Sequence, residues 1–259
     1  LFFVEPLLNL FDCAAKGVRA VIVMSAGFAE AGHAALQDEL VAVARAAGIR
    51  LVGPNTAGFV NFHHRFAATI SMVGDMQPFL AGGVAFITQS GALGGSMLGR
   101  GMEQGVGFSH WVTTGNQSDV DFADCVSHFA QDEGTQVIVG YIEAATDKGR
   151  LIAALELARD NGKRIVVMKV GSSEAGAQAA ASHTASLAGS DQVYDGLFRQ
   201  YGVYRARSID ELFDVAYACS LPTPAPKGRR LGLLTVSGGV GALMADVAAE
   251  CGLDVAPMP

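Results

Sequence analysis

His183 lies among small residues, in the run Ser-His-Thr-Ala-Ser-Leu-Ala-Gly-Ser-Asp of residues 182–191. No neighbour in this run is large enough to cover the imidazole ring, so a phosphate could approach it closely. An apolar run at residues 165–170 precedes it and a helical pattern at residues 193–198 follows, which predicts a loop that leaves a buried strand. Such loops carry the chemistry of α/β folds. A lone loop histidine is more often a solvated side chain, so its neighbours must decide between the two readings.

A second candidate is the run Gln-Ser-Gly-Ala-Leu-Gly-Gly-Ser of residues 89–96, which stands where an expected strand over residues 83–88 turns into a helix. Free backbone amides and the positive end of the helix dipole point out of such a helix start and make it an anion site. A glycine-rich turn can instead serve close packing of helix on sheet. Residue types alone therefore leave two possibilities open, a phosphate site at Ser90, Gly91 and Ala92 or a turn that serves packing only.

A polar loop at residues 113–119 follows another expected strand and precedes a helix expected over residues 120–130. Parallel strands end at one edge of an open sheet, so this loop is expected to share a crevice with the helix start and the histidine loop. Gly115 and Asn116 are therefore predicted to contact phosphate. Asp119 is predicted to be the N-cap of the following helix.

Three further positions keep two readings when only their residue types are considered. Glu143 ends the strand expected over residues 137–141, and a carboxylate there usually faces solvent or caps the next helix. Turns at residues 25–27 and 54–56 follow the two strands expected in the first part of the chain. Their small side chains allow a ligand near the backbone, while ordinary turn chemistry is the alternative.

Composition excludes several classes of partner. The formal net charge is -7 and the longest basic cluster is Arg229-Arg230, which argues against a nucleic-acid surface or a polybasic membrane anchor. The cysteines are widely spaced without a Cys/His ligand pattern, so we expect no disulfide and no metal site, but free buried thiols in the cytoplasm. No apolar stretch reaches the roughly 20 residues of a membrane-spanning helix, and residues 1–4 are not a signal peptide. The chain opens with Leu1 and stops at Pro259 after a strand-like run, so we expect a fragment cut at both ends.

The chain as a whole predicts an α/β fold, because short β-branched runs alternate with alanine-rich segments of helical period. Residues 1–76 are expected to be the C-terminal part of a Rossmann-like domain, and residues 77–220 a flavodoxin-like, doubly wound domain with a parallel sheet. A proline-rich linker at residues 221–228 leads to residues 229–259, the first βα unit of a third flavodoxin-like domain. Strands are expected at residues 20–24, 50–52, 83–88, 107–112, 137–141, 164–169 and 202–204, helices at 33–47 and 242–251, and an irregular stretch at 58–77.

With these segments in view, the chain resembles the NDP-forming acyl-CoA synthetases, relatives of the succinyl-CoA synthetase α subunit. The resemblance covers nearly the whole chain, and five blocks in the family's order are more specific than any single one. The blocks are residues 25–30 (Ser-Ala-Gly-Phe-Ala-Glu), 53–58 (Gly-Pro-Asn-Thr-Ala-Gly), 89–94 (Gln-Ser-Gly-Ala-Leu-Gly), 141–143 (Tyr-Ile-Glu) and 182–191.

The resemblance implies roles for the candidate residues. His183 would carry a phosphoryl group, and Glu143 would orient its ring by accepting a hydrogen bond from one ring N–H, which leaves the other nitrogen as the nucleophile. Ser90 and Gly91 match the family's phosphate-cradling helix start. The pantetheine arm of coenzyme A would run along Ser25, Ala26, Asn55 and Thr56.

The activity implied by the resemblance is an acid–thiol ligase that interconverts acyl-CoA, ADP and phosphate with free acid, CoA and ATP. The path would run through an acyl phosphate and a phosphohistidine. ADP or ATP with Mg would be bound by an ATP-grasp domain or subunit that this sequence lacks, and contacts to the adenine of CoA by a missing amino-terminal part. The enzyme would be a cytoplasmic oligomer. The acyl group and the choice of ADP or GDP stay open.

The sequence leaves three alternatives to the ligase. A protein lysine acetyltransferase can carry a synthetase-like region, but such regions often lack the phosphorylatable histidine, which is intact here. A non-catalytic CoA-binding module is the alternative outside enzymes, and labelling of His183 would separate it from the ligase. A nicotinamide dehydrogenase is less favoured, because no Gly-x-Gly-x-x-Gly stands in the right place.

Overall fold

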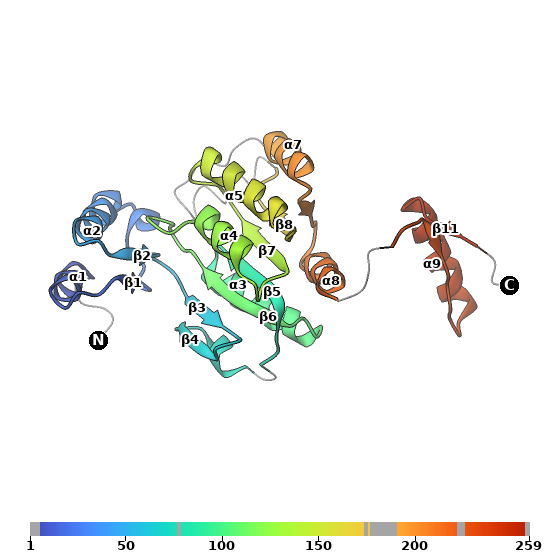
Figure 1. Cartoon of the computed structure of the whole chain (residues 1–259), viewed down its shortest axis with the longest axis horizontal. Coiled ribbons are helices and arrows are strands. Elements are labelled where there is room, and N and C mark those ends of the chain that lie inside the picture. The colour runs from blue at the N-terminus through green and yellow to red at the C-terminus, as the bar shows by residue number, and fades with distance from the viewer. Residues whose placement is uncertain (1–5, 77–78, 174–175, 177–190, 222–225, 257–259) are drawn as a thin grey trace. The chain divides into compact units, whose positions relative to one another are not determined.

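Figure 1 shows the computed structural model, which describes residues 6–76, 79–173, 176, 191–221 and 226–256. His183 lies outside these residues. Contacts divide the chain into a larger unit, which ends at Ser220, and a smaller unit, which begins at Leu221.

A seven-stranded sheet forms the centre of the larger unit, with the strand order β4-β3-β6-β5-β7-β8-β9. Strands β6, β5, β7, β8 and β9 run parallel, and each pair of sequential parallel strands is joined by a helical crossover. The alternation predicted by the sequence is therefore confirmed as an α/β fold. The parallel strands are β5 (Ala81–Thr88), β6 (Phe108–Thr113), β7 (Val137–Ile142), β8 (Arg164–Lys169) and β9 (Tyr204–Arg205).

Helices cover both faces of this sheet, as a doubly wound fold requires. One hydrophobic core contains side chains of α4 (Phe122–Gln131), α5 (Lys148–Asp160) and α7 (Asp191–Tyr201). The core on the opposite face contains side chains of α3 (Gly91–Glu103) and α8 (Ile209–Ser220). The central strand β7 is buried along its whole length, which explains why its sequence is a continuous apolar run.

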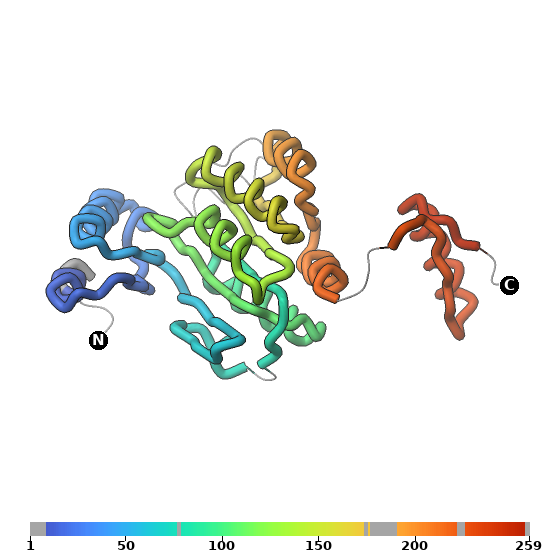
Figure 2. Tube along the Cα trace, in the orientation of Figure 1, coloured from blue at the N-terminus to red at the C-terminus, as the bar shows by residue number. Residues whose placement is uncertain are grey.

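The stretch at residues 58–77, expected to be irregular, contains a β-hairpin. Strand β3 (Gly58–Asn61) pairs antiparallel with β4 (Phe66–Thr69) and also with β6, so the hairpin extends the large sheet (Figures 1 and 2). A short 3-10 turn, η2 (Met72–Asp75), follows. Strands of four residues are too short for a clear period-2 pattern, which is why the sequence did not predict them.

The first part of the larger unit has a small core of its own. Strand β1 (Ala20–Ile22) pairs parallel with β2 (Arg50–Val52), so both strands predicted here are present, and the Rossmann-like domain over residues 1–76 stays a prediction. Leu10, Leu40 and Leu51 are each at most 2% exposed in the core beneath this pair. The helical segments around it are α1 (Pro6–Ala15), η1 (Ala29–Ala31) and α2 (Ala34–Ala46).

The smaller unit is a single βα unit with a second short strand. Strand β10 (Arg230–Leu231) pairs parallel with β11 (Asp254–Val255), and α9 (Gly238–Glu250) lies between them in the chain. The helix begins four residues earlier than predicted, because the Ser237 hydroxyl accepts a hydrogen bond from the Val240 amide at its start. Within the described residues, no helix is long and apolar enough to cross a membrane.

Candidate functional site

The candidate site lies at the edge of the large sheet where the parallel strands end. Strand β5 ends at Thr88 and β7 at Ile142, which are followed at once by Gln89 and Glu143. Because β5 and β7 are hydrogen-bonded neighbours, the segments that follow them are brought side by side. This edge is where open α/β sheets bind ligands.

Ser90 occupies the N-cap position of α3, with an extended backbone and no side-chain hydrogen bond to the helix. The Thr88 hydroxyl accepts from the Ser90 amide at 3.2 Å and donates to the Ser90 carbonyl at 2.9 Å, which fixes the turn. The first-turn amides are therefore not satisfied by a capping side chain, and Ala92 is exposed. The arrangement has the free donors that the predicted phosphate site requires.

The glycines of this turn have separate structural reasons. A Cβ on Gly94 would lie 2.3 Å from Thr88 Cγ2, so close helix–strand packing requires a glycine there. A Cβ on Gly91 would lie 3.1 Å from the Ala57 side chain, a tight contact that a small shift could relieve. The packing alternative therefore accounts for Gly94, whereas it does not require a glycine at Gly91, whose contact with phosphate stays a prediction.

Gln89 ties the start of α3 to the end of β7, a role that the sequence analysis did not assign. Its side-chain oxygen accepts from the amides of Glu143 at 2.6 Å and Ala144 at 3.1 Å, and its nitrogen donates to the Ala144 carbonyl at 2.6 Å. The residue is 3% exposed. In the sequence, the pattern that could have indicated this role of Gln89 is a polar residue between an apolar strand and a helix N-cap.

Glu143 is buried at 4% exposure, so it does not face solvent. It is not a helix cap either, because α5 is capped by Asp147, whose carboxylate accepts from the Arg150 amide at 3.0 Å. Burial, and secondarily the charge of Glu143, raises the pKa of Tyr141 to about 12. Both plain readings of Glu143 are thus excluded, and its orienting role toward His183 stays a prediction.

Lys169 is a further buried charged residue at this edge that sequence reasoning missed. It ends β8 at 5% exposure, donates to the Val170 carbonyl, and places its ammonium 4.8 Å from the centroid of the Tyr194 ring. Burial lowers the pKa of Lys169, and the negative charges of Asp191 and Glu143 oppose that shift. In the sequence, the pattern that could have identified Lys169 is a lysine at the end of an apolar strand, where a buried charge is unusual.

The loop at residues 113–119 contacts the first part of the chain. The backbone N–H of Asn116 donates to the Pro54 carbonyl at 2.9 Å. The side chain of Asn116 forms hydrogen bonds with Glu30, Gln37 and Asn55. Both side-chain N–H groups are taken, so the contacts do not support the predicted phosphate role of Asn116.

Gly115 lets the two segments approach this closely. Its φ is 58°, and a Cβ there would lie 2.3 Å from the Pro54 carbonyl oxygen and 2.5 Å from that of Asn55. The positive φ and the close backbone oxygens therefore require a glycine at position 115. These two constraints explain the residue without a bound ligand.

Thr56 also serves the contact between the two parts. It is 2% exposed, and its hydroxyl lies 2.5 Å from the Thr113 carbonyl oxygen and 2.6 Å from the Thr113 hydroxyl. Its predicted contact with coenzyme A is not supported by this burial. Ser25 and Asn55 are partly exposed and Ala26 is exposed, so these three remain predicted ligand contacts.

Asp119 is not the predicted helix N-cap. It accepts from Arg50 Nε and from the Leu51 amide, each at 2.8 Å, and so joins the loop to β2. The N-cap of α4 is Asp121, which forms a capping box with Asp124. A second acid two residues on offered the same cap, and the sequence does not rank them.

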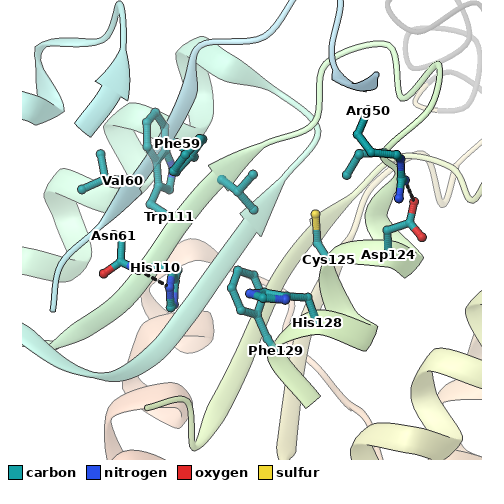
Figure 3. Close-up of a pocket in the computed structure, with 12 residues that line it drawn as sticks. Arg50, Phe59, Val60, Asn61, His110, Trp111, Asp124, Cys125, His128 and Phe129 are labelled. Carbon is teal, nitrogen blue, oxygen red and sulfur yellow. Dashed lines mark hydrogen bonds and ion pairs between the residues drawn. The ribbon is translucent and has the colours of Figure 1, made fainter. Parts of the chain in front are cut away.

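An apolar cavity of about 430 Å³ is lined mainly by residues of α4 and of strands β3 and β6 (Figure 3). Its lining includes Phe59, Phe129 and His110, and Asn61 Nδ2 lies 2.7 Å from His110 Nε2. Among the described residues, no group of three or more His, Cys, Asp or Glu side chains is placed to hold a metal ion. All four cysteines are free, and of these Cys125 is buried while Cys251 is exposed.

Comparison with known proteins gives consistent matches. The model of the succinyl-CoA ligase like flavodoxin domain matches residues 81–219. The α subunit of ADP-forming acetate–CoA ligase II from Pyrococcus furiosus is 40% identical over 252 residues, which cover 96% of this chain and 53% of that protein. The ADP-forming 4-hydroxybutyrate–CoA ligase of Nitrosopumilus maritimus is 31% identical over 98% of this chain and 36% of its own length.

A solved structure agrees with these relatives. The dinucleotide-forming acetyl-coenzyme A synthetase 1 of Ca. Korarchaeum cryptofilum, in complex with phosphate and ADP, matches with a TM-score of 0.87 and 38% identity. The match covers 98% of this chain and 54% of that chain. This chain therefore spans about half the length of that structure and of the Pyrococcus relative.

Proposed function

Because the chain belongs to the family of NDP-forming acyl-CoA synthetases with the succinyl-CoA ligase-like flavodoxin domain, we propose that it is part of an ADP-forming acyl-CoA ligase. The complete enzyme interconverts acyl-CoA, ADP and phosphate with a carboxylate, CoA and ATP. The observation that carries the proposal is the joint placement of the α3 start, the Gln89 bridge and the buried Glu143 at one sheet edge.

The proposed reaction divides into steps in which atoms balance. Phosphate attacks the thioester carbonyl, the C–S bond breaks, and CoA leaves as the thiol while an acyl phosphate forms. A nitrogen of His183 then attacks the phosphorus, and the carboxylate leaves. The phosphoryl group passes from His183 to ADP, which gives ATP and returns the free imidazole.

The described residues have defined tasks in this proposal. Ser90 and Gly91 hold the phosphate through the free amides of the α3 start, where charge develops during transfer. Glu143 accepts a hydrogen bond from one imidazole N–H and stabilises positive charge on the ring. Ser25, Ala26 and Asn55 line the path of the pantetheine arm.

The complete protein is proposed to contain more than this chain. The nucleotide and its Mg are assigned to an ATP-grasp domain or subunit. The Pyrococcus relative is named as an α subunit, which supports such a partner. We further propose an oligomeric enzyme in the cytoplasm. The acetyltransferase alternative is not favoured, because these relatives are named as ligases.

The test is production of ATP by the complete enzyme from acyl-CoA, ADP and phosphate. A panel from acetyl-CoA to aryl-CoA thioesters, each with ADP or GDP, defines the acyl group and the nucleotide. We expect one nucleoside triphosphate to form for each molecule of free CoA released. Transfer of acetyl groups from acetyl-CoA to protein lysines, without triphosphate, would contradict the proposal.

A further inference from the structure

The side chain of Asn116 joins three separate segments of the first part of the chain. Its Nδ2 donates to Glu30 Oε2 and, at 2.8 Å, to Gln37 Oε1. Its Oδ1 accepts from Asn55 Nδ2 at 3.2 Å. One amide group thus holds the turn after β1, helix α2 and the turn after β2 at the same time.

Glu30 fixes its own turn from the other side of this contact. Its Oε1 accepts from the backbone amides of Gly27 at 2.5 Å and Phe28 at 3.1 Å. Burial alone would raise the pKa of Glu30, but the hydrogen bonds from Asn116, Gly27 and Phe28 outweigh it and lower the pKa. The carboxylate is therefore ionised at neutral pH and holds the turn at residues 25–30 in one conformation.

The loop that carries Asn116 is tied in turn to the phosphate edge. The Thr114 amide donates to the Thr88 carbonyl at 2.9 Å, two residues before Ser90. The Ser118 hydroxyl donates to the Gly53 carbonyl at 2.8 Å. A continuous set of hydrogen bonds therefore runs from the α3 start through the loop at residues 113–119 to both turns of the first part.

We propose that Glu30 and Asn116, joined by their side-chain hydrogen bond and here called the Glu30–Asn116 clasp, are positioning residues for the thioester step. This inference rests on the proposed function. The clasp fixes the two turns predicted to hold the pantetheine arm at a set distance from the α3 start, where phosphate attacks. Neither residue touches the reacting atoms, because both side chains are engaged with protein groups. A shift of about 1 Å in such a support can cost about 100-fold in rate.

The polarity of the clasp provides a sharp test in the complete enzyme. Asn116→Asp places a carboxylate against that of Glu30, and Glu30→Gln turns an N–H toward the N–H groups of Asn116. The double variant Glu30→Gln/Asn116→Asp restores a donor facing an acceptor, and Gln37 can turn its own amide to donate. Each single variant is expected to slow acyl-CoA-dependent phosphorylation of the protein by about 10- to 100-fold, typical of supporting partners, and the double variant to recover most of the rate.

Two half-reactions separate positioning from general damage. Phosphorylation by ATP does not use the thioester, so it should be unchanged in the single variants, while the step from acyl-CoA and phosphate slows. Asp119→Asn is the control, because it alters another contact between the same two parts, to Arg50 and Leu51, away from the clasp. It should slow neither half-reaction.

The outcomes are distinct. Equal slowing of both half-reactions, or no recovery in the double variant, would overturn the inference and leave the clasp as ordinary interface structure. If wild-type enzyme were not phosphorylated by ATP at all, the proposed function itself would fail. Measurement of CoA dissociation constants in the same variants is expected to show changes smaller than the change in rate.

Discussion

At the scale of single residues, the site depends on how a buried carboxylate is kept in place. Gln89 binds the amides of Glu143 and Ala144 and so orders the backbone from which the Glu143 side chain extends. Burial of a charged group is costly unless hydrogen bonds or charges compensate it. Lys169 lies near enough for Glu143 to oppose the lowering of the Lys169 pKa. The edge thus holds both an acid and a base at low exposure, which is typical of functional sites.

Glu143→Gln keeps the shape of the side chain and removes its charge. If Glu143 orients His183, the fold and CoA binding should be retained, while phosphorylation by ATP slows by about 10- to 100-fold, as for other supporting hydrogen-bond partners. Rapid-quench measurement of phosphoprotein formation provides the rate. Kinetics equal to wild type would show that the buried carboxylate is structural.

Lys169→Met tests the buried ammonium in the same way. Methionine fills a similar volume but removes the donor to the Val170 carbonyl and the positive charge near Glu143, so the free energy of unfolding should fall by about 1 to 3 kcal/mol. If the ammonium stabilises transferred phosphate, phosphorylation should slow at least about tenfold, as for loss of one charged donor. A large loss of thermal stability with an unchanged rate would give Lys169 a packing role beside Tyr194 instead.

At the scale of elements, the fold was largely predictable because its signals are local. Buried strands such as β7 are continuous apolar runs, and the turn from β5 into α3 is marked by Ser90 and glycine. The hairpin β3–β4 was not predicted, because its pairing with β6 joins segments that lie far apart in the sequence. The same limit applies to Asn116 and Thr56. Their residue types suit a ligand, and only the approach of the two parts of the chain shows that protein groups occupy them.

The start of α3 makes a prediction of its own. Ser90→Asp places a carboxylate at the N-cap of α3, where a phosphate should bind. The helix dipole favours a negative charge there and Asp is a good N-cap, so the fold should be retained while the carboxylate repels the phosphate and takes its place at the amides. Calorimetric titration should show a loss of phosphate affinity much larger than any loss of CoA affinity. Ser96→Asp is the matched control, because it adds the same charge at an exposed position further along α3. It should leave the phosphate affinity close to wild type, and an equally small change for Ser90→Asp would refute the phosphate site.

At the scale of the whole molecule, the described residues account for one complete doubly wound sheet and parts of other structures. The smaller unit exposes Leu234, Val236 and Leu243 and has two short strands, which is less than an independently stable sheet requires. The chain also spans about half of its Pyrococcus relative. We therefore propose that the activity needs the longer protein, in which each variant is measured.

We propose that His183 is the phosphoryl carrier, and labelling of the complete enzyme with phosphate tests this proposal. The complete enzyme is incubated with ATP labelled in the γ-phosphate and with magnesium, then separated from nucleotide and treated with acid or base. We expect a phosphoprotein that is labile in acid and stable in base, absent in His183→Ala, and discharged by ADP. Label that persists in His183→Ala, or that is stable in acid, would show that His183 is not the phosphoryl carrier.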